Sequence, residues 1–542
     1  MNFSRHGVVL LSFAVLFFSG CKEEEPRIDS IYPSIGLMGE VLTIRGENFG
    51  NEQEESYVTV GGVSPTSSSY IVWQDNLISL TTPEFGESGL VYVHRGNKKS
   101  NAALFSNKEA IPTPVTGIEA ETGPRISSIE PKSAAVGSLV TIRGHNFGAF
   151  REESAVFFAW GAEQSPAAPA ELSGPLSVPV FENDFGYEAW GERELRLRVP
   201  DGAISGNLEI RTARGSSRGE YFEVAEKPGS KLYRDKRSYV ISYGVDIRVA
   251  DASAPNTLYI ALPRPAVSAS QRLGELISGK GEPFIENYRG ISLYKLNELA
   301  SNTGTEIAVS YLVEVYAVET AVNVSRIRAG RPSALEAAYT QPSPLVPSGD
   351  PLIRRQAAAI TGREQNPFQK ARLIYNWLLA EGNIQAGNRQ TDVLTALVQK
   401  QIDPYQAALL FCALCRAAGV AALPQAGVLV DRSRGTTPHY WAEFWIEGFG
   451  WIPVDPALGA GAAPPAFNLR PDAAAYYFGN LDNQRICFSR GETTLSQMES
   501  RGRVAARARS YALQNLWEEA VGELVSYSSL WSDIMISGVY VQ

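Results

Sequence analysis

The strongest constraint on the fold of this chain is an internal repeat that keeps its register. Residues 27–33 (RIDSIYP) return as residues 125–131 (RISSIEP), and residues 43–50 (TIRGENFG) return as residues 141–148 (TIRGHNFG). Both pairs are 98 positions apart, so the second copy must repeat the elements of the first in the same order. The chain therefore contains two domains of one kind.

The pattern inside each copy predicts a small β-sandwich. Residues 41–45 alternate between apolar and polar side chains, and the Gly, Asn and Gly that follow predict a tight turn. About 80 to 100 residues of such short strands are enough for two packed sheets. Trp190 lies 117 positions after its counterpart Trp73, whereas the earlier motifs are 98 positions apart. The second copy therefore carries an insertion of 19 residues before its Trp. This insertion is rich in Pro, Ala and Ser near 165–180, and we expect it to be a loop.

The repeated motifs resemble the IPT/TIG family of immunoglobulin-like domains, over residues 28–107 and 125–225. The resemblance implies modules that act as spacers or bind other proteins and have no catalytic activity of their own. His145 falls in the repeated turn, where the first copy has Glu47, and we expect its side chain to face solvent.

The N-terminus has the pattern of an export signal. A positively charged start precedes an apolar run from Val8 to Phe18, which is too short to span a bilayer. Residues 18–21 (FSGC) resemble the lipobox of bacterial lipoproteins, with Phe18 in place of the usual Leu. The resemblance implies a signal peptide over residues 1–20 and acylation of Cys21, whose acyl chains would hold the protein to a membrane. An ordinary signal peptide followed by a chance cysteine is the alternative.

The residues after Cys21 form a short polar tether, up to residue 27. No Asp follows Cys21 directly, which by resemblance to enterobacterial sorting favours the outer membrane. We therefore expect an exported protein that is lipid-anchored in the bacterial cell envelope. Its net charge of −9 and the lack of a dense basic run argue against a nucleic-acid partner.

The back half begins with strand patterns and continues with helices. Residues 238–249 and 307–324 alternate like strands, which predicts a β-rich domain over residues 230–330, and residues 329–349 read as a linker. Asn366-Pro367 and Asp403-Pro404 are helix start signals. The helix expected over residues 405–418 is apolar on nearly every face and therefore belongs in a core. A strand near residues 426–430 is predicted next.

Two aromatic strands follow, and they carry the strongest motif of the chain. Its marked positions are His439, Trp441, Glu443, Gly448, Gly450, Trp451, Pro453, Asp455 and Pro456, and residues 416–420 (RAAGV) precede them. These positions resemble the transglutaminase-like core, over residues 366–458 of a domain that we place at 350–542. The strand-rich region at 230–330 resembles, in layout, the β-rich domain that precedes this core in some bacterial proteins.

The resemblance implies a papain-like fold in which a central helix packs against a sheet. It also implies a mechanism. A Cys at the helix N-terminus attacks as a thiolate, a His on one strand takes its proton, and an Asp on the next strand orients that His. In this sequence His439 and Asp455 occupy the His and Asp positions.

The nucleophile position departs from the family. In the family, the nucleophilic Cys precedes the position of Arg416 by twelve residues. In this sequence that position is Pro404, which has no reactive side chain. Cys412 lies eight residues farther along the helix, about 12 Å away, in an apolar stretch where burial suppresses the thiolate. A hairpin with a four-residue turn would also place Asp455 opposite Ala442, so contact with His439 requires a bulge or another register. The purely structural interpretation of His439 and Asp455 is a retained pair that now only holds two strands together.

The cysteines of this half allow other interpretations. Cys412 and Cys415 form a CxxC pair, but a redox pair belongs at a helix N-terminus, and this pair lies within the helix. A zinc site needs four ligands, for which only Cys487 and His439 remain in this half. We therefore expect buried packing, and neither a metal nor a cofactor. Residues 477–480 and 485–488 are predicted as a strand pair.

A last helix is predicted over residues 503–525, with Leu513, Trp517, Val521 and Leu524 on one face. The predicted fold class is thus a multidomain chain. It has two all-β immunoglobulin-like sandwiches, a β-rich connecting domain and an α+β papain-like core. We predict that the core binds a peptide or glycopeptide without catalysis, and that its partner is a protein or a peptidoglycan-related peptide. An active acyl-transfer or hydrolytic enzyme that acts on cell-envelope proteins is the alternative.

Overall fold

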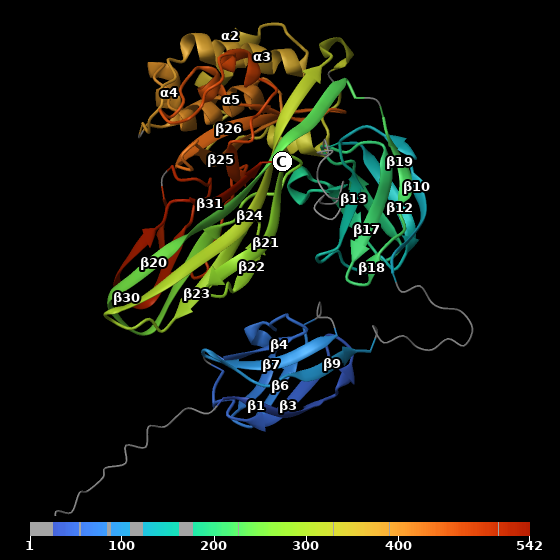
Figure 1. Cartoon of the computed structure of the whole chain (residues 1–542), viewed down its shortest axis with the longest axis vertical. Helices are drawn as coiled ribbons and strands as arrows, with labels where there is room; N and C mark the ends of the chain where they lie inside the picture. The colour runs from blue at the N-terminus through green and yellow to red at the C-terminus, as the bar shows by residue number, and fades with distance from the viewer. Residues whose placement is uncertain are drawn as a thin grey trace, which may run out of the picture. The chain divides into compact units, whose positions relative to one another are not determined.

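The computed structural model describes residues 25–53, 56–83, 88–108, 123–161, 177–225, 227–328, 330–389, 391–507 and 509–541. The predicted signal peptide and Cys21 lie outside the described residues. The chain divides into two compact units, Met1–Ala120 and Glu121–Gln542 (Figure 1). None of the helices in the described ranges combines the length and the apolar character needed to cross a membrane.

The first unit is a β-sandwich, as the alternating pattern predicts. One sheet has the order β1 (Arg27–Tyr32), β3 (Val41–Glu47), β6 (Leu77–Thr81) and β5 (Tyr70–Gln74), and the short 3₁₀ turn η1 (Ser67–Ser69) precedes β5. The other has the order β2 (Ile35–Gly36), β9 (Ala103–Asn107), β7 (Gly89–Arg95) and β4 (Ser56–Val60), with β8 (Lys98–Lys99) beside β7. Alternate residues, such as Leu42 and Ile44, fill the core between the sheets.

The second module repeats this arrangement within the second unit. One sheet has the order β10 (Arg125–Glu130), β12 (Leu139–His145), β16 (Glu194–Arg198) and β15 (Tyr187–Trp190). The other has the order β11 (Ser133–Ala134), β19 (Glu220–Val224), β17 (Gly206–Thr212), β13 (Ala155–Ala159) and β14 (Ser177–Pro179), with β18 (Gly215–Ser216) beside β17. His145 is exposed, as expected, at the end of β12.

The repeated glycine has a steric cause in both copies. A Cβ on Gly46 would lie 1.9 Å from the carbonyl oxygen of Arg27, and a Cβ on Gly144 would lie 1.9 Å from that of Arg125. No other residue allows the two strands to approach so closely. The insertion differs from the simple loop that the composition predicts, because its end contributes strand β14; residues 162–176 lie outside the described ranges.

The connecting domain is an eight-stranded sheet built around one very long strand. Its strands are β21 (Gln271–Lys280), β24 (Thr303–Val322), β20 (Gly229–Pro263), β23 (Ile291–Asn297), β22 (Ile285–Tyr288), β29 (Arg503–Ala505), β30 (Glu518–Trp531) and β31 (Met535–Val541). β20 pairs with β24, β23, β30 and β31 (Figure 1). The alternating segments predicted at 238–249 and 307–324 fall largely in β20 and β24.

Two expectations for this region were wrong. Within residues 503–525, Arg503–Ala505 form β29 and residues 518–525 form the start of β30, and the described residues between them contain no helix. Leu513 packs against α5 residues, whereas Trp517 and Leu524 enter the core of the connecting sheet, and Val521 is half-buried outside both clusters, so the residues of the apparent helical stripe do not share one face. The predicted division into one domain at 230–330 and another at 350–542 is also wrong. The C-terminal strands β30 and β31 pair with β20 and so complete the connecting sheet.

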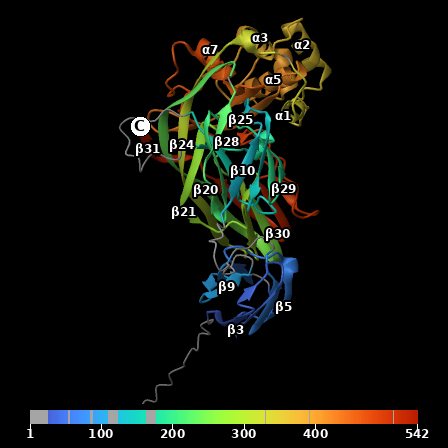
Figure 2. The ribbon, with the colours of Figure 1, turned by 90° about the vertical axis from the view of Figure 1, so that its right-hand side faces the viewer.

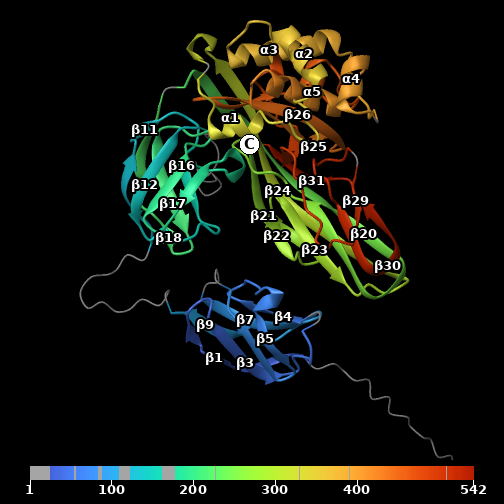
Figure 3. The same cartoon turned by 180° about the vertical axis from the view of Figure 1, so that it is seen from behind.

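The α+β domain packs helices on a four-stranded sheet (Figures 2 and 3). The sheet order is β27 (Gly450–Val454), β26 (Thr436–Ile446), β25 (Ala422–Val430) and β28 (Arg485–Arg490). The helices are α2 (Pro351–Thr361), α3 (Pro367–Glu381), α4 (Val393–Gln399), α5 (Pro404–Ala417), α6 (Pro456–Gly459) and α7 (Ala473–Tyr476).

Local signals predicted most of this domain. The Asn366 side chain caps α3 and the Asp403 side chain caps α5, each followed by Pro at the first position. The predicted linker at 329–349 differs, because its Ser333 starts the short helix α1 (Ala334–Tyr339) after the 3₁₀ turn η3 (Val324–Arg326). Of the strand pair expected at 477–488, only β28 forms.

The C-terminal contribution to the connecting sheet can be tested by truncating one side chain. Trp517 is fully buried in the core of that sheet. We expect Trp517→Ala to lower the free energy of unfolding by about 3–5 kcal/mol. Leu530→Ala, at a 74% exposed position on the adjoining strand, is the control and should change it by less than about 0.5 kcal/mol. Urea denaturation measures both, and similar losses would contradict the placement of this segment.

Candidate functional site

The hairpin of β26 and β27 carries the predicted His and Asp. Ala442 pairs with Val454, and Ile446 pairs with Gly450, so the turn has three residues. The four-residue turn assumed from the sequence is therefore wrong by one position. With this shorter turn, Asp455 lies one position beyond the last strand pair, Ala442 with Val454, and diagonally across from His439. The two residues can therefore meet without a bulge in the hairpin.

The structure brings His439 and Asp455 together. Their Nε2 and Oδ2 atoms are 2.8 Å apart, and the two residues are 1% and 0% exposed. Because an ionised carboxylate only accepts hydrogen bonds, the Nε2–H of His439 is the donor. The carboxylate also accepts from the backbone N–H of Leu458, which makes Asp455 the N-cap of α6.

A buried arginine completes the surroundings of Asp455. Arg485 Nη1 donates to Asp455 Oδ2 over 2.9 Å, and its Nη2 donates to Asp482 Oδ2 over 2.6 Å. Burial alone would raise the pKa of Asp455, but His439 and Arg485 more than offset that effect and hold it at about 2. Sequence reasoning missed Arg485. The signal was an arginine at each end of the apolar segment 485–490, which must be paired if the strand is buried.

Pro404 occupies the first position of α5 and is buried. The preceding Asp403 caps the helix, and its Oδ2 accepts from the backbone N–H of Arg389 and from Nη1 of Arg509, each over 2.6 Å. The ring of Tyr405, in the first turn of α5, lies edge-on to that of Tyr440 at 5.0 Å. The hydroxyl of Tyr440 in turn donates to the carbonyl oxygen of Ser510. C-terminal residues therefore cover the start of this helix.

The three described cysteines are all buried free thiols: Cys412, Cys415 and Cys487. Burial raises the pKa of Cys412 to about 12 and also raises the pKa of the other two. Thiols of this kind are protonated at neutral pH and are poor nucleophiles.

Comparison with known families agrees with this architecture. Residues 354–456 match the sequence model of the transglutaminase-like superfamily. Residues 26–108 and 124–160 match that of the IPT/TIG domain. The chain combines IPT/TIG domains with a transglutaminase-like core. The predicted fold class, with immunoglobulin-like modules ahead of an α+β core, is thereby confirmed.

Individual relatives are distant. An uncharacterized protein of Haemophilus influenzae is 28% identical over 173 residues, which cover 26% of this chain and 46% of the relative. The chain thus spans less than half the length of that relative. A solved structure from Cytophaga hutchinsonii, provisionally assigned as a cysteine protease, aligns at 15% identity over 58% of this chain and 92% of its own, with a TM-score of 0.34.

The periplasmic domain of TgpA from Pseudomonas aeruginosa aligns at 13% identity over 40% of this chain and 87% of its own, with a TM-score of 0.23.

The buried network around Asp455 predicts a large loss of stability when that carboxylate is removed. Asp455→Ala leaves Arg485 with one partner fewer in the interior and removes the α6 cap, so we expect a loss of about 3–5 kcal/mol at pH 7. Asp472→Ala, which breaks an Asp–Arg pair with Arg470 on the surface, should have little effect.

The pH dependence follows from the lowered pKa of Asp455. In the unfolded chain the pKa of this carboxyl is roughly 3.9, and in the folded protein it is about 2. Its contribution to stability is therefore present above roughly pH 4 and is lost as the pH falls toward 2. The difference between wild type and Asp455→Ala should shrink over this range in urea denaturation. A difference that stays constant would argue against an ionised Asp455.

Proposed function

We propose that this chain is an exported, lipid-anchored protein whose transglutaminase-like domain has no nucleophile and works by binding. The observation that carries the proposal is Pro404 at the first position of α5, the place that the family fills with its Cys. A proline ring has no group that can attack a carbonyl carbon, so no acyl-enzyme can form there.

The other thiols offer no replacement. Cys412 and Cys415 lie within the buried body of α5. Cys487 lies on β28, with its Sγ within hydrogen-bond distance of Gln425 Oε1 and of the carbonyl oxygen of Ser489. Each has a raised pKa because of burial. In this proposal His439 and Asp455 serve as a buried hydrogen-bonded pair that fixes the hairpin against β28 through Arg485.

An active acyl-transfer or hydrolytic enzyme is the second candidate. The observation that favours it is the retained contact of 2.8 Å between His439 and Asp455, the orientation that a general base requires. This candidate needs one of the three buried thiols, or another attacking group, to become accessible together with His439.

The partner that we propose is a protein or a peptidoglycan-related peptide in the cell envelope. Because His439 is almost fully covered, such a partner would contact the rim of the hairpin and helices rather than the imidazole itself. The chain's net charge of −9 speaks against nucleic acid as the partner.

Thiol reactivity separates the two candidates. We expect iodoacetamide to leave Cys412, Cys415 and Cys487 unmodified in the folded full-length protein at pH 8, and to modify all three in urea, because burial keeps them protonated and covered. Site-resolved mass spectrometry is the measurement. Rapid modification of one of these cysteines in the folded protein would favour the enzyme.

The anchoring proposal rests on the sequence FSGC at residues 18–21. We expect Cys21→Ser to abolish acylation and to leave the chain uncleaved or released from the membrane. Cell fractionation and mass spectrometry of the N-terminal peptide test this, with Cys487→Ser as a control that should keep its acyl chains. A Cys21→Ser protein that is acylated like wild type would refute the proposal.

A further inference from the structure

The hairpin of β26 and β27 has two ends, and the second IPT/TIG module holds the end opposite His439. The backbone N–H of Gly448, in the hairpin turn, donates to the carbonyl oxygen of Val136 in the module over 3.1 Å. Trp445 and Trp451 share one hydrophobic cluster with the interior of the module, including Val136 and Trp160. These two hairpin side chains therefore belong to the same hydrophobic core as the module.

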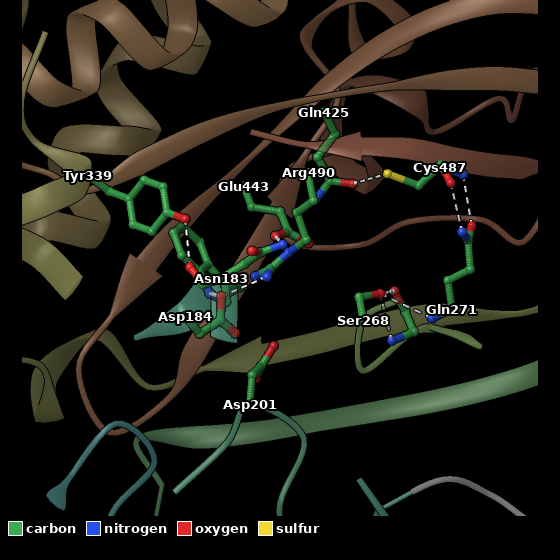
Figure 4. A network of polar contacts seen from close by, with 12 residues as sticks. Asn183, Asp184, Asp201, Ser268, Gln271, Tyr339, Gln425, Glu443, Cys487 and Arg490 are labelled. Atoms are coloured by element: carbon green, nitrogen blue, oxygen red, sulfur yellow. Dashed lines mark hydrogen bonds and ion pairs between the residues drawn. The ribbon is translucent and has the colours of Figure 1, made fainter. Parts of the chain in front are cut away.

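A buried polar network reinforces this contact (Figure 4). Asp184 lies in the 3₁₀ turn η2 (Glu182–Asp184) of the module. Its Oδ1 accepts from Trp451 Nε1 over 3.1 Å and from Arg490 Nη1 over 2.6 Å. Arg490 Nε also donates to Glu443 Oε2 over 2.9 Å. One carboxylate of the module thus reaches Trp451 of β27 directly and Glu443 of β26 through Arg490.

A second ion pair fixes the start of β27. Lys231 of β20 donates to both carboxylate oxygens of Asp201 in the module, over 2.6 and 2.8 Å, and to the carbonyl oxygen of Trp451. Gly450 has φ +101°, and a Cβ there would lie 2.1 Å from Asp201 Oδ1. The hairpin can approach the module this closely because residue 450 is glycine.

The alternation of the strands connects these contacts with the His–Asp pair. Residues two apart on a strand share a face, so His439 and Glu443 lie on one face of β26, four residues or about 13 Å apart. Trp451 lies on the facing strand, β27, and Asp455 lies four residues farther along the chain, directly after that strand ends. The module and the His–Asp pair therefore act on opposite ends of one two-stranded element.

We infer that the second IPT/TIG module is a positioning element for the His439–Asp455 pair, with Asp184 of the module and Arg490 of β28 as the positioning residues. This role differs from that of a spacer or an independent binding module, and it does not depend on whether the domain is catalytic. The two copies have diverged in this respect. The 3₁₀ turn of the first module, Ser67–Ser69, has no acidic residue in its first turn, whereas η2 has Glu182 and Asp184.

Histidine NMR of the full-length protein tests the inference. The chain has four histidines, so selective labelling resolves His439, and His439→Ala assigns its signals. We expect Asp184→Ala to shift or broaden the His439 signals, because the hairpin loses its support and the bond to Asp455 is disturbed. The signals of His94 and His145, which lie in β7 and at the end of β12, should not move.

The matched control is Glu182→Gln, which changes a carboxylate two residues away that pairs with Arg151 within the module. It should leave His439 unchanged. A folded Asp184→Ala protein with wild-type His439 signals would overturn the inference, as would an equal response to Glu182→Gln. If Asp184→Ala does not fold, Trp451→Phe replaces it, since this change removes one donor to Asp184 and keeps an aromatic ring. The same shift or broadening of the His439 signals is expected, and its absence would overturn the inference. Cysteine modification, the test of the proposed function, is independent of all these results.

Discussion

Burial of the β26–β27 hairpin is the constraint on which the second unit depends. Helix α5 packs on Ala442 and Phe444 of this hairpin, the second module packs on Trp445 and Trp451, and β25 pairs along its length. The part of the hairpin that these contacts bury, from His439 onward, cannot leave its polar groups to water. Each carboxylate, arginine and imidazole that it carries must find a partner inside the protein.

The two arginines of β28 supply much of that pairing. Arg485, at one end of the strand, meets Asp455 and Asp482, and Arg490, at the other end, meets Glu443 and Asp184. A buried ion pair gains little over apolar packing, but the loss of one partner leaves an uncompensated charge in the interior. The arginines therefore make the arrangement of hairpin, β28 and second module hard to change one residue at a time.

The two IPT/TIG modules show how one fold serves two structural situations. Both keep the glycine that lets two strands approach, at Gly46 and Gly144, since that contact lies inside each sandwich. They differ in the loops at one end, where the second module has the η2 turn and Trp160 against the connecting and α+β domains. A conserved interior with variable loops is the general way in which a scaffold acquires a new contact.

Local signals in the sequence determined the repeat, the sandwich fold, the capped starts of α3 and α5, the buried character of α5 and the strands of the hairpin. Apart from the repeat, whose two copies lie 98 positions apart, each of these follows from residues within a few positions of one another, as the Asp403 cap with Gln406 illustrates. The tertiary structure alone decided the strands after residue 503, the register that joins His439 to Asp455, and the pairing of Arg485 and Arg490. Arg490 and Asp184 are 306 residues apart, and β30 is a strand because β20 lies beside it. Such contacts arise from burial in the folded chain, where distant charges must pair and distant strands must share hydrogen bonds, and no short segment of sequence contains that information.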